Sequence, residues 1–141
     1  MMNRVRAEGP LNVPSFWNVA KCLKAEPKGL IFRKEGSVLH ASYVRGGTFP
    51  IEEEGKITPG GVSLLSKFAK RGRAEALAHK HAMLFLYGRD LFRGSFKVVS
   101  SPCKRGYVLV YWEGILLGLG RLKRDILYNV IDFGEFLRRG Y

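Results

Sequence analysis

The sequence predicts an α+β chain of two small domains, residues 1–80 and 81–141. Two stretches in the first part space their apolar residues as a helix does, and the second part consists mostly of short apolar runs typical of strands. Because those runs have few residues between them, they favour a small barrel, in which no strand edge stays free. With 141 residues, of which 46% are hydrophobic, the chain can bury a real core.

The first predicted elements follow an arm, residues 1–15, that mixes charge, glycine and proline. Residues 16–24 carry apolar side chains at intervals of three and four, which predicts a short amphipathic helix with Ser15 as its N-cap. Two strands are expected at residues 29–33 and 38–44. A loop containing the acidic run 52–54 should follow them.

The middle of the chain predicts a helix at residues 62–70, interrupted by Arg71-Gly72-Arg73, and renewed helix at residues 74–81. The basic side chains of this stretch are read equally well as a solvated helix face and as a binding surface. From residue 82 the pattern changes to strand: residues 83–87 and 96–100 are expected to be extended, and residues 126–131 a strand or a short turn.

A hairpin at residues 107–122 is the centre of the predicted fold. The run 107–112 is apolar at every position and predicts a buried strand, and Gly114 supplies the turn. In the second strand Gly118 and Gly120 share a face. Three explanations for this face stay open: an RNA backbone approaches there, a neighbouring strand does, or the glycines merely relieve crowding in the barrel.

The charge of the chain points to a polyanionic partner. Twenty-four Lys and Arg stand against twelve Asp and Glu, a formal net charge of +12. A membrane surface would fit this charge, but we find no basic amphipathic helix with exposed aromatic residues and no lipidation motif. Nucleic acid is therefore favoured. The N-terminus lacks the apolar segment of a secretory signal, and we expect a cytoplasmic protein that does not contact membranes.

No catalytic, metal or cofactor site is expected. The histidines of His79-Lys80-His81 have no third ligand nearby, and zinc requires three or four. Asp132-Phe133-Gly134 spells the kinase magnesium triplet by chance, because the catalytic loop of a kinase is missing. Cys22 and Cys103 are expected to be two buried free thiols. One disulfide is the alternative, if the source is a hyperthermophile.

Four segments, in the correct order, resemble PUA domains, the RNA-binding module named for pseudouridine synthases and archaeosine transglycosylases. They are Leu84-Phe-Leu-Tyr-Gly-Arg-Asp-Leu-Phe92, Val108-Leu-Val-Tyr, Leu117-Gly-Leu-Gly-Arg-Leu122 and Asp132-Phe-Gly-Glu-Phe-Leu-Arg-Arg139. The nearest resemblance is to the C-terminal PUA domains of a two-domain ribosome-assembly factor and of RNA cytosine-5 methyltransferases. The resemblance covers residues 82–141 and implies a mixed β-pseudobarrel that binds structured RNA. Residues 1–80 resemble, more loosely, the α/β domain that precedes PUA in the assembly factor, whereas the methyltransferase catalytic domain is missing.

The residues expected to contact RNA are basic side chains from several loops and the two glycines of the hairpin. They are Arg89, Arg93, Lys104, Arg105, Gly118, Gly120, Arg121, Lys123, Arg124, Arg138 and Arg139. We expect the basic groups to form one patch. The alternative for the C-terminal pair is an exposed ion pair of Arg138 with Asp132 or Glu135, unrelated to RNA.

The function expected from these observations is non-catalytic binding of structured RNA, with ribosomal RNA preferred and tRNA second. Ribosome biogenesis, including rRNA processing, or RNA modification would be the setting. The alternative is a protein–protein adaptor of a ribosome-assembly or RNA-modifying complex, whose charge serves only solubility.

Overall fold

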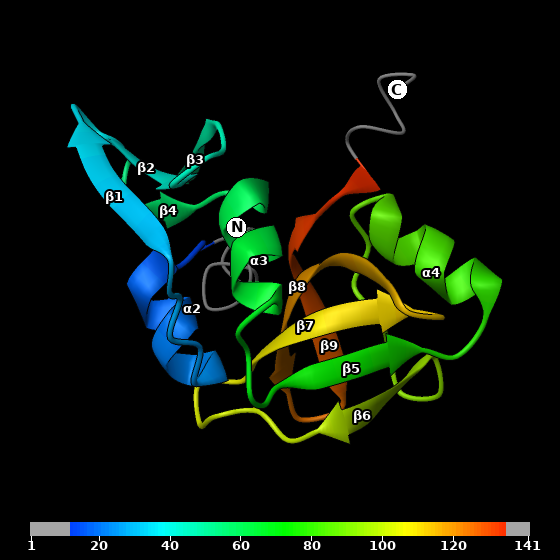
Figure 1. Ribbon diagram of the computed structural model, residues 1–141. Coiled ribbons are helices and arrows are strands. Elements are labelled where there is room, and N and C mark those ends of the chain that lie inside the picture. Colours follow the sequence, from blue (N-terminus) through cyan, green and yellow to red (C-terminus); the bar gives the residue numbers. More distant parts are fainter. Residues whose placement is uncertain (1–11, 135–141) are drawn as a thin grey trace, which may run out of the picture.

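The computed structural model describes residues 12–134 of the chain (Figure 1). Short helices and strands build two sheets with helices packed against them, which confirms the α+β class. The elements, in chain order, are α2 (Phe16–Leu23), β1 (Leu30–Glu35), β2 (Val38–Tyr43), β3 (Thr48–Glu53), β4 (Lys56–Ile57), α3 (Pro59–Ser66), β5 (Arg73–Ala76), α4 (His79–Leu86), β6 (Phe96–Ser100), β7 (Tyr107–Trp112), β8 (Ile115–Lys123) and β9 (Ile126–Asp132).

The first sheet is an antiparallel meander in the order β1-β2-β3-β4. Ala41, Ile51 and Ile57 are buried along it, whereas β1 has no fully buried residue. One face of the sheet thus contributes to a core and the rest meets solvent, as is common for antiparallel sheets. Helix α3 packs chiefly against β3 of this sheet.

The second sheet has the order β6-β5-β7-β8-β9. All its neighbours are antiparallel except β5 and β7, which run parallel. The predicted hairpin is confirmed as β7 and β8, and its turn residues Glu113 and Gly114 both have positive φ, as a tight two-residue turn requires. β7 is the third of the five strands and therefore forms the middle of the sheet.

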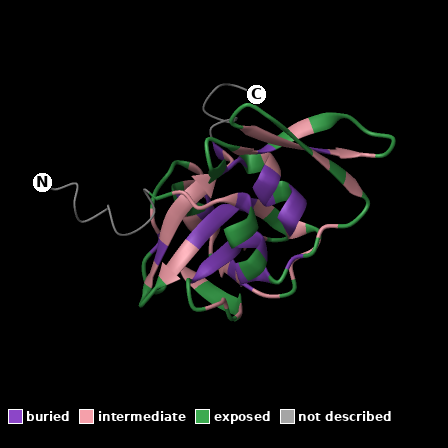
Figure 2. Cartoon of the chain, turned by 90° about the vertical axis from the view of Figure 1, so that its left-hand side faces the viewer, coloured by how far each residue is buried: buried purple, intermediate pink, exposed green. Residues whose placement is uncertain are grey.

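Two hydrophobic cores lie on opposite faces of this second sheet. Tyr107 and Leu109 of β7 point into the first core, together with buried residues of α2 and α3. Val108 and Val110 point into the second, against Phe85 of α4. Since side chains alternate along a strand, β7 is apolar at every position because both of its faces are covered. Figure 2 shows the buried residues gathered in the middle of the molecule and the exposed ones at turns and outer faces.

Helix α2 begins where the sequence predicts, whereas α3 begins at Pro59 and ends at Ser66 instead of covering residues 62–70. Ser15 caps α2, its Oγ accepting a hydrogen bond from the backbone N–H of Asn18 at 3.2 Å. Thr58 caps α3 and precedes Pro59, a residue favoured in the first helical turn. Its Oγ1 accepts from the N–H of Gly61 at 3.0 Å and donates to the carbonyl of Pro50 at 2.8 Å. Thr58 therefore joins α3 to the first sheet.

Three local expectations are wrong. The acidic segment expected to be a loop forms β3, a turn and β4. Residues 74–76, expected to be helical, belong to strand β5, and the expected strand 83–87 lies mostly in helix α4. β5 is extended because it pairs with β6 and β7, partners far away in sequence. Tertiary pairing here outweighs the helical preference of Ala and Glu.

The cysteines are also not two free thiols. Cys22 at the end of α2 and Cys103 before β7 form a disulfide, with Cα atoms 5.2 Å apart. The alternative that the sequence left open is the one observed. The bond connects residues 81 apart and joins α2 to the loop that leads into β7.

The predicted division of the chain at residue 80 falls within α4, while β5 before it already belongs to the second sheet. The exact boundary stays a prediction. Among residues 12–134, no helix is long and apolar enough to cross a membrane.

Candidate nucleic-acid interface

Five of the predicted RNA-contacting side chains come together at the open end of the β7–β8 hairpin. We call them the hairpin cluster: Lys104, Arg105, Arg121, Lys123 and Arg124. The first two belong to the loop between β6 and β7, the next two to β8 and the last to the turn before β9. All but the half-buried Arg121 are exposed.

Backbone contacts hold the hairpin cluster together. The N–H of Leu122 donates to the carbonyl of Gly106 at 2.7 Å, which fixes the loop against β8. Arg121 Nε donates to the carbonyl of Arg105 at 2.9 Å, and its guanidinium lies 5.6 Å from the ring centre of Tyr107. The loop that carries Lys104 and Arg105 therefore lies against the end of β8 that carries Arg121. That these cations contact RNA stays a prediction.

Arg93 lies next to this cluster, and Arg89 lies further along β9. Reciprocal backbone bonds between Leu91 and Leu127 attach their segment to that strand. Arg93 forms an exposed ion pair with Asp125, at 3.7 Å, beside Arg124. Such a pair contributes under about 1 kcal/mol, so Arg93 can exchange it for a phosphate at little cost.

The two hairpin glycines are buried against β9. A side chain at Gly118, whose φ is +150°, would meet the carbonyl oxygen of Ile131, and one at Gly120 would meet Leu127 and Tyr128. Of the three explanations left open by the sequence, a neighbouring strand is what lies against this face. The two glycines thus position β9, and with it the turn that carries Arg124.

Arg138 and Arg139 fall outside the described residues. That they join the hairpin cluster in one patch stays a prediction, as does the alternative ion pair of Arg138.

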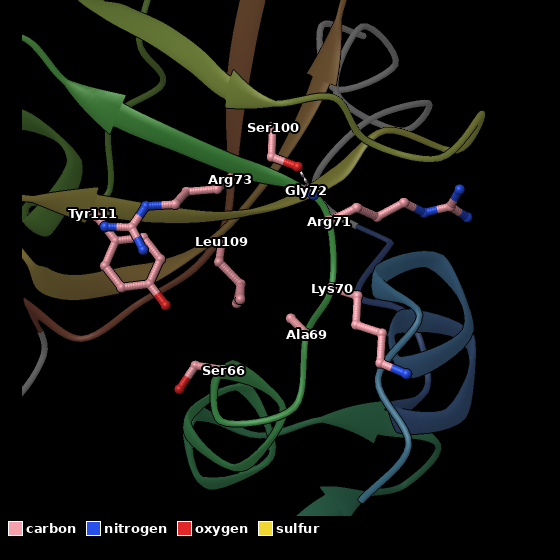
Figure 3. Close-up of a pocket in the computed structure, with 9 residues that line it drawn as sticks. All are labelled: Ser66, Ala69, Lys70, Arg71, Gly72, Arg73, Ser100, Leu109 and Tyr111. Atoms are coloured by element: carbon pink, nitrogen blue, oxygen red, sulfur yellow. Dashed lines mark hydrogen bonds between the residues drawn. The ribbon is translucent and has the colours of Figure 1, made fainter.

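The structure also shows a pocket that the sequence did not reveal, between the segment after α3 and strands β5 to β7 (Figure 3). It has a volume of about 210 Å³, and its wall includes Ser66, Leu109 and the ring of Tyr111. The guanidinium of Arg73 lies over that ring at 3.8 Å and forms an ion pair with Glu75. Flat groups of this kind can stack on an unpaired base.

A second unpredicted feature is a cleft of about 310 Å³ between α2 and the loop that precedes β7. We call it the junction cleft, and its lining residues are Asn18, Lys21, Cys22, Arg71, Cys103, Lys104 and Arg105. It thus shares Lys104 and Arg105 with the hairpin cluster and adds Lys21 and Arg71 from the first half. The sequence could not indicate this, because the disulfide brings together residues far apart in the chain.

No group of three or more acidic, His or Cys residues within residues 12–134 is arranged to hold a metal ion. His79 and His81 both lie in α4, which the sequence also suggested for this segment.

No curated protein matches the chain. Residues 74–141 match the family model of the UPF0113 PUA domain. The matched region starts within β5 and includes β6 to β9 of the second sheet. It also includes all five residues of the hairpin cluster. The match agrees with the resemblance found in residues 82–141 and extends it toward the N-terminus. Residues 74–141 are therefore similar to a PUA domain.

Proposed function

We propose that this protein binds structured RNA without catalysing a reaction, and that it uses its PUA domain to do so. A PUA domain generally implies RNA binding. We further propose ribosomal RNA as the preferred target and tRNA as the second, in ribosome biogenesis or RNA modification in the cytoplasm. Partner proteins from a ribosome-assembly or RNA-modifying complex belong to the same proposal.

The observation that carries this proposal is the hairpin cluster. Five cations from two loops and a strand meet at the open end of the hairpin. There Arg121 Nε donates to the carbonyl of Arg105, and the N–H of Leu122 donates to the carbonyl of Gly106. A fixed set of cations suits the regular phosphate spacing of a folded RNA, and contacts to phosphates position an RNA without reading its sequence. The expected pseudobarrel belongs to the proposal as well, with the C-terminal segment as its closing strand.

The experiment measures RNA affinity against salt concentration for the whole protein. Each neutralised phosphate should contribute about 0.7 to 0.9 to the slope of log affinity on log salt. We expect a slope of several units for the wild type. The double variant Lys123→Ala, Arg124→Ala should bind more weakly and show a slope smaller by about 1.4 to 1.8, because two phosphate contacts are lost.

The matched control is Arg33→Ala with Lys34→Ala, which also removes two adjacent cations. Both residues are exposed on β1 in the other sheet, and the contact of Arg33 with Glu35 is a surface ion pair. The control should keep the wild-type slope. If both double variants weaken binding equally, net charge alone attracts RNA and the hairpin cluster is not the site.

The adaptor function is the second candidate, and exposed apolar side chains in the first half favour it. Trp17 is 49% exposed and Ile31 is 59% exposed, and the Trp17 ring packs edge-on against Phe32. A protein partner could cover these residues. If the wild type shows no RNA binding at low salt, the adaptor function is the one that remains.

A further inference from the structure

We infer that the junction cleft is a phosphate-binding site, so that one RNA backbone contacts the N-terminal half of the chain as well as the PUA domain. This inference rests on the proposed function and specifies it. The ligand is the phosphodiester backbone of the same RNA that the hairpin cluster binds.

The first argument is the charge of the cleft. Four of its seven lining residues are basic and none is acidic. Like charges held close together repel each other, and the protein supplies no carboxylate in the lining to offset that repulsion. Its volume of about 310 Å³ can hold a phosphate group and several waters, each of which takes about 30 Å³. An anion in the cleft would lower the electrostatic energy of all four cations.

The second argument is that the cations are held in place. Arg71 Nε donates to the carbonyl of Cys22 at 2.8 Å, which directs the guanidinium, and its terminal Nη atoms are the part that can donate to a phosphate. The N–H of Lys70 donates to the carbonyl of Leu23 at 2.9 Å and fixes this segment to the end of α2. Figure 3 shows the Arg71 side chain pointing away from the neighbouring pocket.

The third argument is the disulfide. It joins Cys22 to Cys103. Lys21 directly precedes Cys22, and Lys104 directly follows Cys103, and both lysines line the cleft. The bond therefore keeps cations of the two halves side by side despite their repulsion. A covalent link at this point makes the basic cleft a permanent feature of the folded protein.

The fourth argument selects RNA over a small free anion. Arg105 lines the junction cleft, and its carbonyl accepts the hydrogen bond from Arg121 in the hairpin cluster. The two basic surfaces are thus continuous. A chain of phosphates can follow them from α2 to the turn before β9, whereas a single small anion would use only one part.

The test replaces Lys21, an exposed residue on α2, with Ala, which favours a helix at least as well. RNA affinity should fall severalfold, and the salt slope should decrease by about 1, the value expected for one lost phosphate contact. Lys21→Glu should weaken binding further, because it places a negative charge among the remaining cations. Circular dichroism should show the same melting temperature for both variants as for the wild type.

Lys28→Ala is the matched control. Lys28 is an exposed lysine from the same half that does not line the cleft, and its loss should leave the salt slope unchanged. If Lys21→Ala and Lys21→Glu both bind as the control does, the inference is overturned. The proposed function would still stand in that case, provided that Lys123→Ala with Arg124→Ala weakens binding. If neither the Lys21 variants nor the double variant weakens RNA binding, both the inference and the proposed function are overturned.

Discussion

The two sheets of this protein differ in how many of their faces are covered. Strand β1, at the edge of the first sheet, has no fully buried residue, whereas β7 has four in succession and separates two cores. Burial of apolar surface is the dominant favourable contribution to folding. We therefore expect the free energy of unfolding to depend mainly on β7, β8 and what lies against them, and the outer strands of the first sheet to tolerate change.

The largest difference in stability between the two regions is expected for substitutions of glycine. In Gly118→Val the new side chain would meet the carbonyl of Ile131 in β9, and φ of +150° is unfavourable for valine. We expect destabilisation of about 4 kcal/mol or more, which can leave no folded protein. Circular dichroism and urea denaturation measure it.

Gly47→Ala is the control from the first half of the chain. Nothing lies within 4 Å of a side chain at Gly47. The melting temperature of the Gly47→Ala variant should match that of the wild type. Normal folding of Gly118→Val would show that β9 can move away from β8 without cost, which contradicts the packing described above.

The next effect compares one apolar side chain from each sheet. Leu119 of β8 is fully buried in the first core, and Leu119→Ala should cost about 2 to 5 kcal/mol through lost contacts and a cavity. Ile31 of β1 is 59% exposed, so Ile31→Ala should change stability by only about 0.5 kcal/mol. Equal losses in urea denaturation would mean that the first sheet is covered in solution, for example by a second protein.

The smallest effect concerns the helix caps. Thr58→Ala removes a hydroxyl that both caps α3 and donates to Pro50, and should cost about 1 to 2 kcal/mol. Ser15→Ala removes the cap of α2 and should cost about 0.5 to 1 kcal/mol. Thermal melts of the two variants rank them. A larger loss for Ser15→Ala would show that the bond from Thr58 to Pro50 contributes nothing.

Local signals predicted several elements whose partners are near in sequence, but not the short hairpin of β3 and β4. The hairpin follows from its apolar runs and Gly114, and α2 from its apolar spacing and Ser15. The four residues of β5 gave no such signal, because their extended form comes from pairing with β6 and β7. In α4 a nearly continuous apolar run was read as a strand. Phe85 is buried and Leu84 is 43% exposed, a one-sided burial that composition alone could not show.

The candidate site was predictable to a similar extent. Lys104, Arg105, Arg121, Lys123 and Arg124 could be grouped from the sequence because they flank one hairpin. Lys21 and Arg71 could not be added, since only the disulfide and the packing of α2 bring them to that place. The glycines were correctly singled out as points of close approach. What approaches them, a strand, became visible only in three dimensions.

The first core, which combines residues of α2 and α3 with residues of β7 and β8, has a consequence for folding during synthesis. The core beneath α2 and α3 includes Tyr107, Leu109 and Leu119, which are synthesised long after the two helices. Until the hairpin leaves the ribosome, the first hundred residues expose apolar side chains that have no permanent cover, a condition that favours aggregation or chaperone binding. We therefore expect nascent chains arrested before residue 107 to be cut readily by protease, and chains arrested well after residue 132 to resist it.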